Sequence, residues 1–210
     1  MKLDYLYWFY QSALSKKFCK DVIKLGKKKQ SKTAGTISIN TEEEKISKKQ
    51  SKDLKKYRHS NIVWLDEPWI YDEITNYVGD ANKKANWNFE VDRCEQAQFT
   101  IYNKSQYYHW HMDQLPKPYV NPTNLNTHGK TRKLSVTVSL SDPDDYKGGN
   151  LEFCTQGQVN CTKTVVSRCK EIKPQGSIVV FPSFLNHRVT PVTKGTRYSL
   201  VLWYLGKPWK

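Results

Sequence analysis

The sequence predicts a mainly β protein with flanking helices, an α+β fold in which a jelly-roll barrel is buttressed by N-terminal helices. From residue 87 onward, short runs rich in β-branched and aromatic residues alternate with turn residues, as is typical of barrels built from short strands. The preceding 86 residues contain two stretches of helical periodicity. The 210 residues suffice for one substantial core, and 13% aromatic residues argue against a disordered chain. We therefore expect a single domain over residues 1–210.

The first 86 residues are expected to support the barrel. Residues 4–10 carry an aromatic side chain at almost every position, as expected of a strand buried on both faces or of an aromatic plug. Ser15 is a candidate N-cap for an amphipathic helix over residues 16–25. Gly26 follows where a C-terminal cap is expected.

A strand over residues 61–65 and a helix over residues 69–82 are expected next. The helix start is indicated by Asp66, Glu67 and Pro68, because acidic residues and proline are typical of a first helical turn. We expect three apolar residues of this helix to face a sheet: Trp69, Ile74 and Val78.

Eight strands are predicted in the part of the chain that forms the barrel. Their expected ranges are 87–91, 96–102, 107–111, 134–140, 150–153, 178–181, 187–189 and 197–204.

The net charge of +14 indicates an anionic partner without identifying it. A cationic surface attracts nucleic acid, acidic proteins and anionic small molecules alike. Much of the excess lies between residues 16 and 58, and residues 27–57 are rich in Lys, Ser, Thr and Gln. We expect this stretch to be a flexible, solvated basic segment; a dedicated RNA or DNA patch is the alternative.

The cysteines and the lack of apolar stretches predict a cytoplasmic protein. The five cysteines form no CxxC pair, and their odd number cannot be fully paired within one chain, so free thiols in a reducing compartment are expected. No run of 18 apolar residues exists, and the N-terminus lacks the apolar core of a signal peptide. We expect no membrane association, and a monomer is the default.

Two His and one Asp are predicted to form a metal site. His111 and Asp113 follow a strand-like run, so alternation places both on the same side of the backbone and turns Met112 away. A second imidazole, His187, lies in another expected strand. This ligand set leaves three octahedral positions open, which suits an iron that must bind a chelating cosubstrate and then dioxygen. Each signal is weak alone, because a His-x-Asp triplet is frequent by chance.

Arg197 strengthens the hypothesis, since it lies ten residues after His187 in a run of alternating apolar residues. Burying an unpaired guanidinium is very unfavourable, so Arg197 must reach solvent or meet an anion. A dicarboxylic acid supplies such an anion, and the planar guanidinium can hold a carboxylate through two parallel hydrogen bonds. The alternative is a structural salt bridge to an acid such as Glu152.

Three blocks of the chain resemble the prolyl-4-hydroxylase-like branch of the 2-oxoglutarate and iron dioxygenases. Residues 101–113 are similar to the family's Tyr-x-x-Gly-x-x-Tyr-x-x-His-x-Asp, with Ser105 where glycine is usual. Residues 134–153 resemble the central strand, turn and Gly-Gly hairpin entry, and residues 181–203 resemble the block that carries the second His and the Arg. The resemblance covers residues 87–204, the expected catalytic core.

The resemblance implies a double-stranded β-helix that binds Fe(II) through His111, Asp113 and His187 and 2-oxoglutarate through Arg197. It also implies the reaction, in which O2 and 2-oxoglutarate are converted to succinate and CO2 while an unactivated C–H bond is hydroxylated. The substrate implied is a prolyl residue of a peptide or protein. Tyr102 matches the first tyrosine of the motif and is expected to place its phenol near 2-oxoglutarate.

Four further residues are expected to line the cavity. Ser139 shares a strand face with two other small hydroxyl residues, which either bind the cosubstrate in the lumen or face solvent. Trp203 lies on the same strand face as Arg197. His109 lies two residues before a predicted ligand and is expected to point inward, and Tyr108 matches the second tyrosine of the motif. The last three are assigned to the substrate pocket.

The connection over residues 114–132 is predicted to be a lid. A connection of this length between strands is uncommon unless it covers a site. We expect Leu115, Tyr119 and Val120 to close over the iron, and we assign no ligand role to His128.

Two other functions remain open from the sequence. The basic charge favours oxidative demethylation of nucleic acid by the same iron chemistry, although we find no second arginine after Arg197 and no base-flipping wedge of the kind such enzymes carry. The other alternative is that the protein is not an enzyme but a jelly-roll binding module without catalytic activity. Iron-dependent succinate formation would separate enzyme from binder, and salt-dependent affinity for nucleic acid would favour the demethylase.

Overall fold

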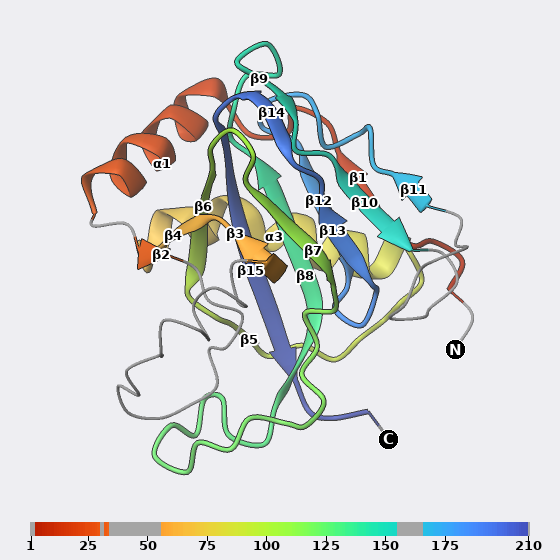
Figure 1. The fold of residues 1–210 in the computed structure, drawn as a ribbon. Helices are drawn as coiled ribbons and strands as arrows, with labels where there is room; N and C mark the ends of the chain where they lie inside the picture. The colour runs from red at the N-terminus through yellow and green to blue at the C-terminus, as the bar shows by residue number, and fades with distance from the viewer. Residues whose placement is uncertain (1–2, 30–31, 34–55, 155–165, 210) are drawn as a thin grey trace.

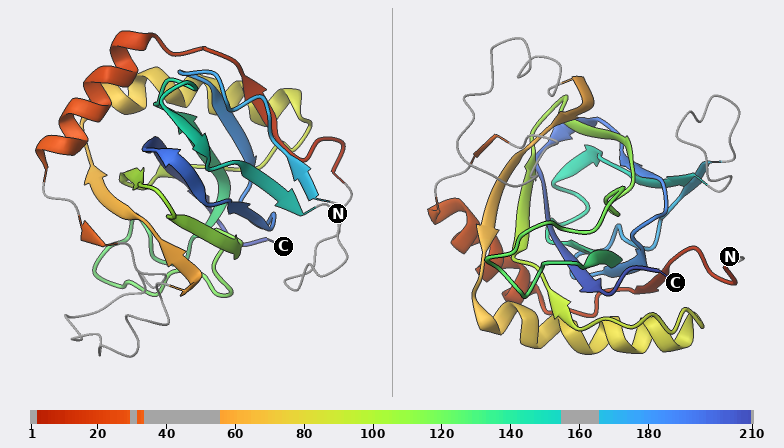
Figure 2. Two further views of the ribbon diagram at one scale, coloured as in Figure 1. Left: turned by 45° about the horizontal axis from the view of Figure 1, so that its top comes forward. Right: turned by 90° about the horizontal axis from the view of Figure 1, so that it is seen from below.

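The strands of this computed structural model pair in antiparallel ladders that curve around a common interior (Figures 1 and 2). The structure describes residues 3–29, 32–33, 56–154 and 166–209. The prediction of a flexible segment over 27–57 therefore falls mostly outside the described residues.

The strands form two sheets and a ribbon (Figure 1). The eight-stranded sheet contains, in spatial order, β1 (Trp8–Tyr10), β12 (Ile178–Pro182), β8 (Thr131–Ser139), β15 (Arg197–Gly206), β6 (Ala97–Tyr102), β4 (Asn61–Leu65) and β2 (Lys32–Thr33), with β5 (Arg93–Cys94) paired to β15. The five-stranded sheet contains β11 (Val166–Arg168), β10 (Leu151–Cys154), β13 (His187–Val189), β7 (Tyr107–His111) and β3 (Arg58–His59). The ribbon contains β14 (Val192–Gly195) and β9 (Tyr146–Gly148).

In the described part of the chain, α1 (Lys16–Lys28) and α3 (Pro68–Lys84) cover the outer face of the larger sheet, as Figure 2 shows. Their apolar residues join those of the sheet in the largest hydrophobic core. On β8 the apolar residues, such as Val136, face this core, so the alternating hydroxyl residues face the interior instead. Among the described residues, no helix is both long and apolar enough to cross a membrane.

In each helix one residue has a different place from the one predicted, and packing against the sheet explains the difference. The Ser15 side chain caps α1 by accepting from the Phe18 backbone N–H at 3.0 Å, as predicted, but Gly26 lies inside the helix. A Cβ at Gly26 would lie 2.3 Å from the Phe99 ring, so glycine allows α1 to approach β6. In α3, Trp69 was expected to face the sheet, but its side chain is 38% exposed. The neighbouring Ile70 is fully buried instead.

Seven of the eight predicted strands are present, and the one over residues 87–91 is wrong. Asn86 and Asn88 have φ values of 56° and 51°, which interrupt an extended chain. The backbone of Phe89 instead forms two hydrogen bonds with the side chain of Asn82, at 2.9 and 3.0 Å. The aromatic segment at the N-terminus forms a short edge strand, β1, paired with β12.

Replacing Ser105 with glycine is expected to stabilise the protein. Ser105 joins β6 to β7 with a φ of 68°, a left-handed conformation that costs an L-residue about 1–2 kcal/mol. The greater freedom of glycine in the unfolded chain offsets about 0.4–1 kcal/mol of this. We expect the free energy of unfolding to rise by about 0.5–1 kcal/mol, as measured by chemical denaturation. The adjacent Lys104→Gly is the control and should lower stability; a loss in both variants would contradict the prediction.

Candidate metal centre

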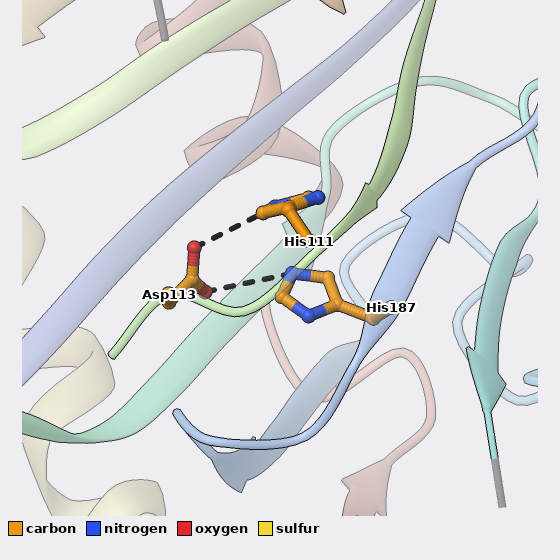
Figure 3. A group of neighbouring side chains, drawn as sticks. All are labelled: His111, Asp113 and His187. Carbon is orange, nitrogen blue, oxygen red and sulfur yellow. Dashed lines mark ion pairs between the residues drawn. The ribbon is translucent and has the colours of Figure 1, made fainter. Parts of the chain in front are cut away.

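Two side chains from neighbouring strands of the five-stranded sheet, and a third from just beyond the end of one of them, converge inside the barrel (Figure 3). His111 ends β7, Asp113 follows two residues later, and His187 begins β13. The two strands are neighbours in the sheet, and His187 is the Cα partner of His111. All three side chains are at least nine-tenths buried. The sheet register therefore brings together residues that are 76 positions apart in the chain.

The donor atoms are spaced as one metal ion requires. The Asp113 Oδ1 atom lies 3.6 Å from His111 Nε2, and the Oδ2 atom lies 3.5 Å from His187 Nε2 (Figure 3). One ligand atom from each residue lies within 4.8 Å of the others. Metal–ligand bonds of about 2.1 Å at right angles separate adjacent donors by about 3 Å. The two carboxylate–imidazole distances of 3.6 and 3.5 Å are close to this value. Two imidazoles and one carboxylate form the facial set typical of non-haem Fe(II).

Backbone carbonyls orient both imidazoles. The Nδ1–H of His111 donates to the His109 carbonyl at 2.8 Å, and the Nδ1–H of His187 donates to the Leu185 carbonyl at 2.9 Å. Because a carbonyl only accepts, each ring carries its proton on Nδ1 and presents the lone pair of Nε2 to the interior. The local chain thus fixes the tautomer that metal binding needs.

Asp113 is held by a hydroxyl pair and remains ionised. Ser135 on β8 donates to Asp113 Oδ2 at 2.7 Å, and its hydroxyl lies 2.9 Å from that of Ser183. Burial by itself would raise the pKa of Asp113, but His187, His111, a nearby arginine and the Ser135 hydrogen bond bring it to about 2. Burial, and then the neighbouring His187, keep the pKa of His111 well below its usual value. At neutral pH both residues are therefore in the form that binds metal.

The metal-free protein is expected to lose stability as the pH falls below 6.5. The unfolded chain protonates His111 near pH 6.5 while the folded protein resists it, so stability is fully present above that pH and is lost below it, by up to about 1.4 kcal/mol per pH unit. Asp113 adds a second loss between about pH 3.9 and pH 2. Denaturation at pH 7.5, 6.5 and 5.5 measures the first loss. In His111→Gln the slope should flatten, and an unchanged slope would refute this assignment.

Arg197 is buried without an acidic partner. Its side chain is 2% exposed, and its Nη1 donates to Ser199 Oγ at 3.1 Å. Among the described residues no carboxylate pairs with it. The structural alternative is wrong, because Glu152 accepts instead from Arg188 at 2.8 Å. Gly149 leaves room for the arginine, since a Cβ there would lie 2.8 Å from Arg197 Cδ.

Most of the predicted wall residues share one cavity with the metal ligands and Arg197. Tyr102 is the Cα partner of Arg197, and its ring centre lies 5.4 Å from the guanidinium carbon. Trp203 also lines the cavity, and among the described residues its buried indole N–H has no hydrogen-bond partner. Ser139 is buried, which excludes the solvent-facing alternative, but its strand neighbour Thr137 lines the cavity in its place. A cosubstrate contact for Ser139 stays a prediction.

A β-bulge places His109 outside the metal cavity, although strand parity predicted that it points inward. Its assignment to the substrate pocket stays a prediction. His187 pairs with His111, and Val189 pairs with Tyr108. These partners are two residues apart on β13 but three residues apart on β7, so β7 contains one extra residue. The extra residue interrupts the alternation of side chains along β7. Tyr108 therefore lines the cavity together with His111, while His109 is exposed. His109 lies on the wall of an adjoining cleft outside the metal cavity.

The predicted lid does not cover the site in this conformation. Tyr119 donates to Glu95 at 2.9 Å, Val120 is 68% exposed, and neither they nor Leu115 line the cavity. Glu95 also forms two 2.7 Å hydrogen bonds with Arg132. The loop is therefore held in place by the partly buried contacts of Tyr119 and Arg132 with Glu95.

Arg58 is a cavity residue that sequence reasoning missed. It is 6% exposed, it lines the same cavity as the metal ligands, and it pairs in the sheet with Tyr108. Its place at the end of a lysine-rich stretch gave no sign of burial. The only available signal was its position two residues before the expected strand over 61–65.

Comparison with known proteins agrees with this geometry. The 2OG-Fe(II) oxygenase superfamily matches residues 97–205. A PKHD-type hydroxylase of Teredinibacter turnerae is 34% identical over 112 residues, 53% of this chain and 43% of the relative. One of Xylella fastidiosa is 33% identical over 141 residues, 62% and 54% of the two chains. The chain thus spans about half the length of these relatives.

The fold is that of a solved prolyl hydroxylase. The structure of a viral collagen prolyl hydroxylase from Paramecium Bursaria Chlorella virus-1, in complex with 2OG, superposes with a TM-score of 0.63 over 97% of both chains, at 18% identity. At this identity the likeness concerns the fold, and it agrees with the predicted jelly-roll barrel.

Proposed function

Because the chain belongs to the 2OG-Fe(II) oxygenase superfamily, we propose that it is an Fe(II)- and 2-oxoglutarate-dependent dioxygenase that hydroxylates a prolyl residue of a peptide or protein. The observation that carries this proposal is a single cavity that holds both His111, Asp113 and His187 and the buried, acid-free guanidinium of Arg197. A binding module without chemistry has no use for an open metal site beside an anion site.

The residues of the cavity divide the work between metal, cosubstrate and substrate. His111, Asp113 and His187 would hold Fe(II), which when bound supplies the redox chemistry with O2 and 2-oxoglutarate. Arg197 would bind the distal carboxylate of 2-oxoglutarate, and Tyr102, whose ring centre lies 5.4 Å from the Arg197 guanidinium carbon, would contribute its phenol there. The protein contributes positioning and the exclusion of water, and no acid-base pair is needed.

The relatives support proline as the target. The matched relatives are PKHD-type hydroxylases, and the solved structure with the same fold is a prolyl hydroxylase. Tyr108 and Trp203 place two aromatic rings on the cavity wall, a surface suited to an apolar pyrrolidine ring. Cys19, Cys94 and Cys169 are free thiols, which supports the proposed cytoplasmic location.

The test is incubation with Fe(II), 2-oxoglutarate and O2 in the presence of proline-containing peptides. We expect mass spectrometry to find a gain of one oxygen on proline, matched by an equal amount of succinate. Chelation of the metal should abolish both products. Modification of an oligonucleotide in place of the peptides would favour the demethylase, and no iron-dependent succinate at all would leave a binding module.

A further inference from the structure

Arg58 is a second buried arginine in the metal cavity, and it also lacks an acidic partner. Its Nε donates to Ser60 Oγ at 3.0 Å, and its guanidinium carbon lies 4.4 Å from the centre of the Tyr108 ring. In the described part of the chain no carboxylate pairs with it. Its two terminal amino groups therefore keep their hydrogen-bonding capacity in a cavity where it is 6% exposed.

The charges of the filled cavity leave Arg58 uncompensated. Asp113 is the only acid among the described residues that line the cavity. A divalent cation, Asp113, a dicarboxylate and Arg197 together carry no net charge. Arg58 then contributes one positive charge that no bound group balances, and a buried unpaired guanidinium is very unfavourable. One further negative charge completes the cavity.

We propose that Arg58 binds a carboxylate of the substrate, so that the protein selects a proline flanked by aspartate or glutamate. This proposal rests on the proposed function and names its substrate class. A guanidinium holds a carboxylate through two parallel hydrogen bonds, which fixes the orientation of the acidic residue as well as its charge.

The position of Arg58 suits a residue next to the target. Arg58 and His111 both contact the Tyr108 ring: the guanidinium carbon lies 4.4 Å from its centre, and the His111 ring stacks on it with centres 3.5 Å apart. The bound carboxylate would therefore lie beside the metal site without competing for the metal. Tyr108 and Val189 also form a wall of the adjoining cleft, which leaves room for the peptide beyond the acidic residue.

A peptide carboxylate fits this site better than a nucleic-acid phosphate. The carboxylate stands at the end of a flexible side chain and can enter a cavity in which Arg58 is nine-tenths buried. A phosphodiester is flanked by two sugars, which must enter the same space. The net charge of +14 attracts either polymer from a distance and does not discriminate between them.

The first experiment measures binding to the full chain without added metal, so that it does not depend on turnover. Fluorescently labelled peptides of equal length contain one proline with Asp, Asn or Lys at each position from two before to two after it. At one of these positions we expect Asp to bind at least about tenfold more tightly than Asn. Because surface attraction is screened by salt, the preference should persist in 0.5 M NaCl.

Variants of Arg58 assign the preference to this residue. Arg58→Met should abolish the difference between Asp and Asn peptides, while Arg58→Lys, which keeps the charge but loses the planar fork, should keep part of it. The control is Arg93→Met, because Arg93 is exposed on β5 and does not line the cavity. Circular dichroism checks that each variant folds, and the comparison of peptides on the natural protein needs no variant.

Several results would overturn the proposal: an Asp preference that disappears in high salt, one that survives in Arg58→Met, or an oligonucleotide that displaces the peptides. The fate of the proposed function is separate. Hydroxylation of Asp and Asn peptides with equal efficiency and affinity would leave the function standing and remove the role of Arg58. Selective binding of the Asp peptide without hydroxylation would keep the role of Arg58 and remove the proposed function.

Discussion

Replacing His111 with alanine is expected to abolish iron-dependent succinate formation and to weaken Fe(II) binding by at least about 100-fold. Substitution of residues that merely support metal ligands costs 10–100-fold, and loss of a ligand should cost more. Asp113→Ala and His187→Ala should have the same effect, because the three donor atoms form one site. Metal titration monitors affinity, and succinate release monitors turnover.

His109 provides a matched control for this experiment. It is the same residue type on the same strand, two positions away, but the bulge in β7 places its side chain outside the metal cavity. We expect His109→Ala to keep the metal affinity of the natural protein. Loss of the metal in His109→Ala together with its retention in His111→Ala would contradict the assignment of His111 as a metal ligand.

The strands at the centre of the barrel were predictable because the pattern that defines each of them lies within its own residues. β7 and β13 agree with their expected ranges, and β12 differs by one residue, since alternation and bounding turn residues define them. Several strands of two to four residues were missed, among them β3, β9 and β14. Their hydrogen bonds depend on partners distant in the chain, and a few residues carry no measurable periodicity.

The bulge in β7 shows why a site can be predicted only in part. Alternation correctly placed His111 and Asp113 on one side, because both lie beyond the irregularity. It failed for His109, because the extra residue is specified by pairing with β13 and leaves no trace in β7 itself. Similarly, Gly26 resembles a helix cap in sequence, and only the position of the Phe99 ring reveals that glycine is required for packing.

Arg197 and Arg58 show the same limit for charged residues. Arg197 stood out because its neighbours in the strand are apolar, which indicates burial. Arg58 follows a lysine-rich stretch, and its burial results from pairing between β3 and β7. A buried charged residue can be recognised in the sequence only when its neighbours in the strand are apolar and so indicate burial themselves.

Replacing Arg197 with methionine is expected to raise the KM for 2-oxoglutarate by about 100-fold or more, with a smaller effect on kcat. Truncating one partner of a buried, hydrogen-bonded charge pair costs about 2–5 kcal/mol, which corresponds to about 30- to 5000-fold in affinity. Lys194→Met is the control, because Lys194 is exposed on β14 three residues away. Succinate formation at varied 2-oxoglutarate concentration measures both constants.

A second cosubstrate separates a specific contact from general damage. 2-Oxobutanoate keeps the chelating end of 2-oxoglutarate and lacks the distal carboxylate, so the natural protein should strongly prefer 2-oxoglutarate and Arg197→Met should lose that preference. Damage to the cavity would instead weaken both cosubstrates equally. An unchanged KM in Arg197→Met would imply that Arg58, the other acid-free guanidinium on the cavity wall, holds the dicarboxylate. The KM of Arg58→Met for 2-oxoglutarate would then rise in its place, which would reverse the two roles assigned to these arginines.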